Sequence, residues 1–272
     1  MKRKILSILS MMLIILIASC SNKTSSSSNI EKGKDDTIVI GCMALNAEAV
    51  EEIKRLMENE GYKMEVKIFD GNNLPALALS ANEIDGLILN HKPWIDTFNK
   101  ANNSHLVLVD GFKYASLNAL YSSKHKTLED IPDNAVITIS NDPSNMDRGL
   151  RFLEKLGLLK LGEKTGEFYT MIDIKENPKN IKFLEVETTS TAGSYADADA
   201  TITFSSVMKN AGFDAHSYIV EDGEYNNFPT GLVVNEGNEN SQWAKDIVKV
   251  TQTEEYKNKF NEIFKGAYII YW

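Results

Sequence analysis

Short apolar segments alternating with amphipathic helical patterns are the feature that most restricts the fold of this chain. Strands are expected at residues 37–41, 64–69, 85–89 and 106–109, and helices at 48–59, 74–81 and 94–100. This alternation favours a parallel α/β sheet that binds ligands at the carboxyl ends of its strands. The sequence therefore predicts an α/β fold with a site at one edge of a sheet.

The first 36 residues have the pattern of an export signal followed by a tether. Three basic residues at positions 2–4 precede an apolar run at 5–18, which is typical of a signal peptide and too short to span a membrane. Cys20 directly follows this run and resembles the modified cysteine of a bacterial lipobox, which implies cleavage after residue 19 and lipid on its sulfur. The alternative is an ordinary secretory signal with a chance cysteine. The serine-rich residues 20–36 predict a flexible tether.

Charge and size restrict the partners of the remaining chain. Removing residues 1–19, with Lys2, Arg3 and Lys4, takes the formal net charge from −9 to −12, which makes nucleic acid an improbable partner. The 236 residues from Thr37 onward suffice for two lobes. With Cys20 lipidated, Cys42 has no partner for a disulfide and is expected to be a small buried hydrophobe.

Residues 136–157 carry the most distinctive candidate for ligand binding. A strand at 136–139 leads through Asp142-Pro143 into a helix, which Ser144 or Asn145 could cap. Arg148 lies in the first helical turn, where the macrodipole disfavours a cation. Free N–H groups and a guanidinium at one helix start would form a carboxylate receptor. The alternative is an arginine that pairs with Asp142 or is simply solvated.

The rest of the chain predicts a second α/β region and a return to the first. A crossing is expected at residues 117–121 and the return near 223–231, and the apolar tail at 268–272 is expected to pack back on the body. The other expected elements are a polar helical turn at 175–180, strands at 181–186, 200–203, 218–221 and 232–234, and helices through 211 and at 241–251 and 254–264.

Several segments together resemble the methionine-binding NlpA-type lipoproteins, the substrate-binding subunits of a class of bacterial ABC importers. The matching segments are Leu89-Asn90-His91-Lys92-Pro93-Trp94-Ile95-Asp96-Thr97-Phe98-Asn99, residues 121–145, residues 153–161, Glu176-Asn177-Pro178-Lys179-Asn180-Ile181-Lys182-Phe183 and Phe264-Lys265-Gly266-Ala267. The resemblance implies a two-lobe periplasmic-binding-protein-like α/β fold with two crossing segments, a ligand enclosed between the lobes, no catalytic residues and no cofactor.

The resemblance also implies a domain organisation and a set of partners. The signal peptide covers residues 1–19, the lipidated tether 20–36, the first lobe 37–114 with 231–272, and the second lobe 115–230. The expected partners are a small amino-acid-like ligand, an importer permease and, through the lipid on Cys20, the extracytoplasmic face of a bacterial cell membrane. A monomer is expected. The competing interpretation is a surface lipoprotein that acts in adhesion or host interaction.

Two residues match the family's site by position. In the family an arginine after the Asn-Asp-Pro turn binds the ligand carboxylate, which implies this role for Arg148, and His91 corresponds to the pocket histidine. Trp94 replaces a tyrosine of the aromatic cage. A lone histidine and tryptophan at a strand end would otherwise favour core packing, and the resemblance reverses that preference.

Four positions depart from the family's methionine site. Asn72 and Leu89 stand where cage aromatics are usual, and Phe204 and about Thr230 stand where asparagines bind the amino group. Loss of one such acceptor leaves a buried ammonium without a partner, at a cost of about 1–3 kcal/mol. We therefore expect a small carboxylate ligand: methionine, a related amino acid or a short peptide.

Other chemistries find little support in the sequence. The carboxylates are scattered on helical faces, and no serine or cysteine nucleophile motif appears, so we expect no enzyme. The four histidines lack the spacing of metal ligands. Asp197 and Asp199 could belong to a cation site, but they are expected to flank a strand at the surface.

Overall fold

The computed structural model describes residues 32–271. The predicted signal peptide, the predicted lipidation site Cys20 and most of the predicted tether lie outside these residues. Within residues 32–271 no helix is long and apolar enough to cross a membrane.

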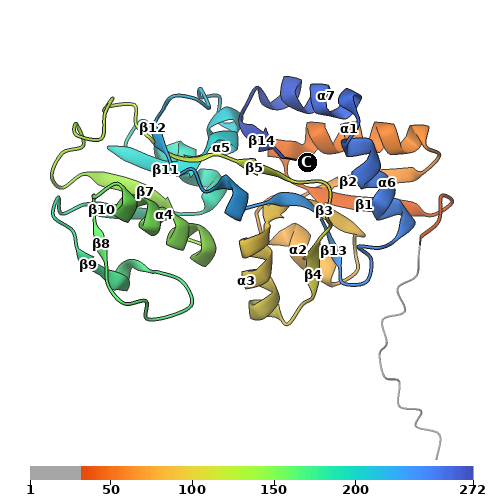
Figure 1. Ribbon diagram of the computed structural model, residues 1–272, viewed down its shortest axis with the longest axis horizontal. Coiled ribbons are helices and arrows are strands. Elements are labelled where there is room, and N and C mark those ends of the chain that lie inside the picture. The colour runs from red at the N-terminus through yellow and green to blue at the C-terminus, as the bar shows by residue number, and fades with distance from the viewer. Residues whose placement is uncertain (1–31, 272) are drawn as a thin grey trace, which may run out of the picture. The chain divides into compact units, whose positions relative to one another are not determined.

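The first sheet is parallel at one end and antiparallel at the other. Strands β1, β2 and β3 pair in parallel, as the strand–helix alternation predicts, whereas β13 is antiparallel to both β3 and β4, and β14 is antiparallel to β5. The order is β14-β5-β13-β3-β1-β2, with β4 also paired to β13 (Figure 1). The strands are β1 (Thr37–Cys42), β2 (Lys63–Ile68), β3 (Gly86–His91), β4 (Leu106–Leu108), β5 (Tyr114–Ser116), β13 (Thr230–Asn235) and β14 (Tyr268–Ile270).

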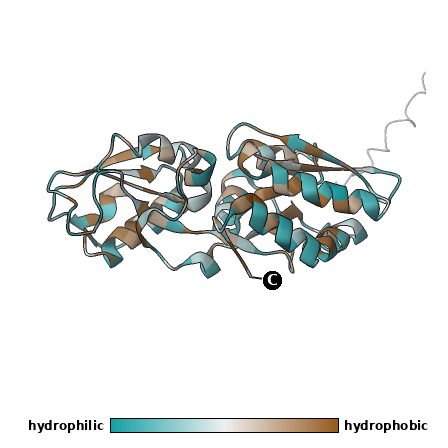
Figure 2. Ribbon diagram, turned by 90° about the horizontal axis from the view of Figure 1, so that it is seen from above, coloured by the Kyte–Doolittle hydropathy of each residue, from teal (hydrophilic) through white to brown (hydrophobic). Residues whose placement is uncertain are grey.

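Helices cover both faces of the first sheet. Ile38 and Ile40 of β1 pack with one group of helices, and Leu87 of β3 packs with the other. The first group is α1 (Ala47–Asn59), α6 (Gln242–Thr251) and α7 (Glu254–Phe264), with the short η1 (Ala44–Asn46) before α1; the second is α2 (Leu74–Ser80) and α3 (Lys92–Asn102). The outward faces of the first group are mostly hydrophilic (Figure 2). Burial of one apolar stripe per helix explains this arrangement.

The second sheet has the order β10-β7-β11-β6-β12. Leu150 and Leu153 of α4 pack against it, while Val207 and Met208 of α5 lie with Tyr121 in a separate core cluster. The strands are β6 (Asn118–Tyr121), β7 (Val136–Ser140), β10 (Lys182–Val186), β11 (Ala200–Phe204) and β12 (Tyr218–Glu221). The helices are α4 (Pro143–Lys155), η3 (Thr188–Ser194) and α5 (Ser205–Asn210), with η2 (Met171–Asp173) and η4 (Tyr225–Asn227) in connections.

Two short passages join the sheets. Leu117 alone separates β5 of the first sheet from β6 of the second, and the chain returns between the end of β12 and the start of β13. In addition, α3 contacts α4, and η1 contacts α5. These passages bring the strand ends of both sheets to one place, where the candidate site lies.

The prediction of a helical turn at residues 175–180 is wrong. Ile174–Glu176 forms strand β9, which pairs with β8 (Lys160–Leu161). The following residues form a turn, because the Asn177 side chain accepts the N–H of Ile181 and Asn180 has a φ of 50°. Local side-chain hydrogen bonds of this kind compete with helix formation. The apolar tail does pack on the body, as β14 beside β5.

Candidate functional site

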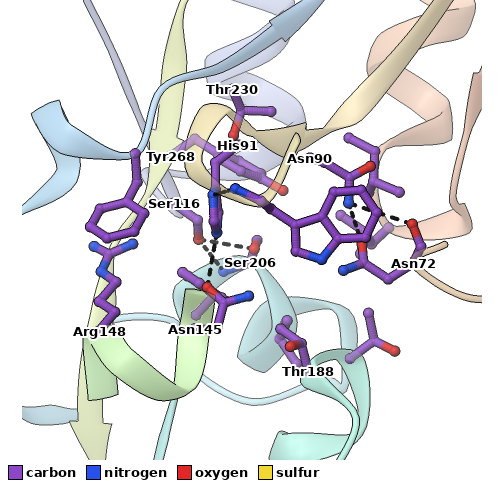
Figure 3. A pocket seen from close by; sticks show the side chains of 17 residues that line it. Asn72, Asn90, His91, Ser116, Asn145, Arg148, Thr188, Ser206, Thr230 and Tyr268 are labelled. Carbon is purple, nitrogen blue, oxygen red and sulfur yellow. Dashed lines mark hydrogen bonds between the residues drawn. The ribbon is translucent and has the colours of Figure 1, made fainter. Parts of the chain in front are cut away.

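A partly open cavity of about 70 Å³ lies where the two sheets meet, and all seven sequence-predicted ligand residues line it. Figure 3 shows side chains that line this cavity. Asn72, Leu89, His91 and Trp94 come from the segment between β2 and α3, and Thr230 begins β13. Arg148 and Phe204 come from α4 and β11. The remaining lining residues are Leu45, Asn90, Ser116, Asn145, Thr188, Thr189, Ser206, Val207, Phe228 and Tyr268.

Arg148 is held by an aspartate that the sequence analysis did not find. Its side chain is 1 % exposed, with Nε donating to Asp222 Oδ2 at 2.6 Å and Nη2 donating to Oδ1 at 3.0 Å. Asp142 is not its partner, because that carboxylate caps α4 and accepts the N–H of Asn145 at 3.1 Å. The prediction of a cap at Ser144 or Asn145 is therefore wrong, and so is the alternative that pairs Arg148 with Asp142. Because α4 begins at Pro143, Arg148 lies in its second turn, so the prediction that it lies in the first helical turn is also wrong. The acidic pair that ends β12 was the available signal.

The other faces of the guanidinium meet aromatic rings and the cavity. The Arg148 Cζ atom lies 3.9 Å from the ring centroid of Phe228 and 5.5 Å from that of Phe204. Such contacts stabilise a desolvated cation. Nη1 is buried and has no hydrogen-bond partner among the described residues. Phe228, which sequence reasoning missed, also packs edge-on against His91, with the ring centroids 5.1 Å apart.

The return passage is attached to one face of α4. Lys155 Nζ donates to the backbone carbonyl of Asp222 at 2.7 Å, and Arg151 Nη1 donates to Glu224 at 2.8 Å. From the second sheet, Asn118 Nδ2 donates to Asp222 Oδ2 at 3.0 Å. The position of the Asp222 carboxylate is therefore set by several contacts besides Arg148.

His91 connects the two sheets through one hydrogen bond. It is the N-cap of α3, where its Nδ1 accepts the backbone N–H of Trp94 at 3.1 Å. The ring proton of the neutral form is therefore on Nε2, which donates to Asn145 Oδ1 of α4 at 2.9 Å. Burial lowers the pKa of His91 to about 4, with the Arg148 charge acting in the same direction and the Asn145 hydrogen bond opposing it. His91 is accordingly a neutral hydrogen-bonding wall of the cavity.

The neutral His91 is expected to make stability depend on pH. The unfolded histidine takes up its proton near pH 6.5, whereas the folded one does so only near pH 4, so this contribution is complete above pH 6.5 and falls below it. Between pH 7.5 and 4.5 the loss amounts to about 2–3 kcal/mol. Urea unfolding at both pH values should show a correspondingly larger loss for the wild type than for His91→Asn, whose side chain can still cap α3. Equal losses would contradict this assignment.

The far wall of the cavity is polar as well as apolar. Asn90 Nδ2 donates to Asn72 Oδ1 at 2.7 Å, and the buried Asn90 Oδ1 has no partner among the described residues. Trp94 is 6 % exposed and stacks on Phe98 with ring centroids 5.5 Å apart, so it belongs both to the core and to the cavity wall. Asn90 lies beside His91 in sequence, but nothing in the sequence marked it as a candidate.

Cys42 and Asp199, which the sequence analysis discussed, do not line the cavity and have contacts within the fold. Cys42 is free and buried, as predicted, and burial raises its pKa to about 12. Asp199 accepts the backbone N–H of Val136 at 2.8 Å, and His125 lies 3.5 Å from the same carboxylate. Within residues 32–271, no group of three or more histidines, cysteines and carboxylates could hold a metal ion.

Two α/β sheets joined by two passages, with a cavity lined from both, define the class of two-lobe substrate-binding proteins with the periplasmic-binding fold. The model of the NlpA lipoprotein family matches residues 38–272, and the chain belongs to this family. This membership places it among membrane-associated binding lipoproteins.

Relatives and solved structures agree with this assignment. Outer membrane lipoprotein 1 of Mannheimia haemolytica is 32% identical over 86% of this chain and 86% of its own. The D-methionine-binding lipoprotein MetQ of Escherichia coli K12 is 28% identical over 95% and 94%. A nutrient binding protein from Burkholderia cenocepacia, solved bound to methionine, superposes with a TM-score of 0.80 at 27% identity, covering 86% of this chain and all of its own.

Proposed function

We propose that this chain is the membrane-anchored substrate-binding lipoprotein of an ABC importer, and that it captures methionine, a related amino acid or a short peptide between its lobes. The observation that carries the proposal is the cavity between the sheets, where Arg148 presents a buried, unpaired Nη1. A carboxylate oxygen is the natural partner of such a donor. The ligands of two similar proteins, D-methionine for MetQ of Escherichia coli and methionine for the Burkholderia cenocepacia protein, are of this kind.

Methionine itself is the first candidate, although the cavity differs from the usual methionine site of the family. The resemblance matches His91 and Arg148 to the family's site by position, and it implies that Asn72 and Leu89 replace two aromatic residues. It likewise implies that Phe204 and Thr230 replace two asparagines. Phe204 supports the cation of Arg148 and offers no acceptor to an ammonium group. A ligand whose side chain is more polar than a thioether therefore remains the main competitor.

The finer parts of the proposal concern anchoring and assembly. The lipid is attached to Cys20 after removal of residues 1–19, and the tether carries the body on the extracytoplasmic face of the membrane. The first lobe comprises residues 37–114 and 231–272, the second comprises 115–230, and the protein acts as a monomer with a permease as its partner. It performs no catalysis. No observation on residues 32–271 favours the alternative of adhesion.

Calorimetry of the ligand-free protein tests the proposed function. We expect one site per chain that takes up L- or D-methionine, another amino acid or a dipeptide from a panel of these compounds, with Kd in the micromolar range or below, at about −8 kcal/mol or stronger. The matched control is Lys92→Ala, which removes an exposed cation of α3 that pairs with Asp96 outside the cavity. Absence of binding by every panel member would contradict the proposal.

A further inference from the structure

Among residues 32–271, Arg148 is the only arginine in the cavity wall, and a carboxylate behind it already neutralises its charge. Asp222 occupies Nε and Nη2 of Arg148 and is itself 4 % exposed on its side chain, and it is not among the residues that line the cavity. A ligand can therefore reach the guanidinium through Nη1 but cannot replace Asp222 without leaving a buried carboxylate unpaired. The pair contributes one positive and one negative charge and sums to zero.

No other ionised side chain belongs to the cavity wall that the structure describes. His91 is neutral, and the remaining lining residues are amides, hydroxyls, aromatic rings and aliphatic groups. An occupant with a net charge would be buried against a wall whose side chains, with Asp222, sum to zero. Behind this wall the Asp142 carboxylate accepts from Asn145 and Thr188, which adds to the cost of a net anion. Burial of an uncompensated ion is costly, whereas opposite charges within one occupant compensate each other.

Two buried polar atoms of the wall lack a partner, and they are of opposite kinds. Arg148 Nη1 is a donor, and Asn90 Oδ1 is an acceptor because the amide nitrogen of Asn90 is directed to Asn72. Figure 3 shows Arg148 and Asn90 on opposite sides of His91. Buried polar groups are normally satisfied. An occupant that carries both an anionic acceptor and a nitrogen donor would satisfy both atoms.

Building on the proposed function, we propose that Asp222 sets the charge preference of the site, so that the cavity selects a zwitterionic occupant of zero net charge over a net anion or a net cation. One carboxylate oxygen of the occupant binds Nη1 of Arg148, and its nitrogen donor is directed to the acceptor side of the cavity, where Asn90 Oδ1 lies. Asp222 does not touch the occupant; it acts through Arg148 as a positioning and specificity-determining residue.

The Glu224–Arg151 pair provides a matched control. Glu224 lies two residues beyond Asp222 in the same return passage and pairs with the same helix, but its side chain is 29 % exposed and does not line the cavity. Removal of its charge should therefore perturb the passage without changing the charge next to the ligand.

The test is calorimetry with three probes of one shape and different charge: L-methionine, its 2-hydroxy acid analogue and L-methioninamide, of net charge zero, minus one and plus one. The wild type should bind methionine at least about tenfold more tightly than either analogue. Asp222→Asn keeps one of the two acceptor oxygens and leaves the Arg148 charge uncompensated. It should therefore shift the affinity ratio by about tenfold towards the hydroxy acid and away from the amide. Glu224→Gln should leave both ratios unchanged.

Each outcome bears on a different statement. The inference is overturned if the wild type binds the hydroxy acid as tightly as methionine. It is also overturned if Asp222→Asn weakens the binding of all three probes equally, because Asp222 then has only a structural role. In both cases the proposed function stands. If methionine does not bind, the series is repeated on the panel amino acid that does; if none binds, the proposed function fails and the inference falls with it. Should Asp222→Asn not fold, Asp222→Ser takes its place, because it also removes the charge and keeps one acceptor oxygen, and the same two affinity ratios decide.

Discussion

Replacement of Arg148 by alanine is expected to lower the free energy of unfolding by about 3–5 kcal/mol, because it leaves the buried Asp222 carboxylate without its cation. The same change removes the only charged donor of the cavity wall and should weaken ligand binding by about 2–5 kcal/mol. Urea unfolding measures the first effect and calorimetry with the best-binding panel compound measures the second. Unaltered affinity in a folded variant would show that the ligand carboxylate is not bound by Arg148.

A double variant separates these two effects. Arg148→Met with Asp222→Asn removes both charges, so that no buried ion is left unpaired, and most of the lost stability should return. Asn118 can still donate to the side-chain oxygen at position 222. Ligand affinity should remain as low as in Arg148→Ala, because the donor is still missing. Recovery of affinity together with stability would mean that the arginine supports the fold only.

Gly231→Ala is expected to cost about 3 kcal/mol of unfolding free energy or more. Gly231 follows the cavity residue Thr230 in β13, and a Cβ atom there would lie 2.1 Å from the backbone carbonyl oxygen of Phe112. Backbone on both sides must then move, which cannot be relieved by rotation of a side chain. Denaturant unfolding monitored by circular dichroism measures the loss.

Gly193→Ala is the matched control for that change. Gly193 lies in η3, between β10 and β11 of the second sheet. A Cβ atom there would meet nothing within 4 Å. Its effect should lie within about 0.5 kcal/mol of the wild type. A similar cost at both positions would mean that glycine is required at position 231 for a reason other than the approach of Phe112.

The local elements were predictable because their causes are local. The apolar alternation of β1, the proline at the start of α3 and the Asp142-Pro143 turn before α4 each depend on residues within one or two turns of chain. The error at residues 175–180 also has a local cause. Polar residues there were interpreted as a helical turn, whereas the Asn177 side chain closes a turn of its own.

The wall of the site was predictable only through family resemblance. His91 and Trp94 have no distinguishing local pattern. Without the resemblance, an isolated histidine and tryptophan at a strand end would have been assigned to the core. Their assignment to the cavity depended on matching segments spread over the chain. Asn90 lies in a matched segment that gave it no role, and Phe228 lies outside the matched segments. Their contacts with Asn72 and Arg148 join separate parts of the chain. These contacts follow from packing of the two sheets and leave no periodic signature.

The sequence by itself determined that this is an α/β chain, that a helix containing Arg148 follows a buried strand, and that seven particular residues are candidates for one site, because hydrophobic periodicity, turn chemistry and matched segments are written along the chain. Only the tertiary structure decided what Arg148 is paired with. Asp222 is 74 residues away and meets the guanidinium because the return passage is attached to α4. The charge of a buried site depends on every ion within a few ångströms. The charge preference proposed for the cavity could therefore not be inferred before the return passage that carries Asp222 was placed.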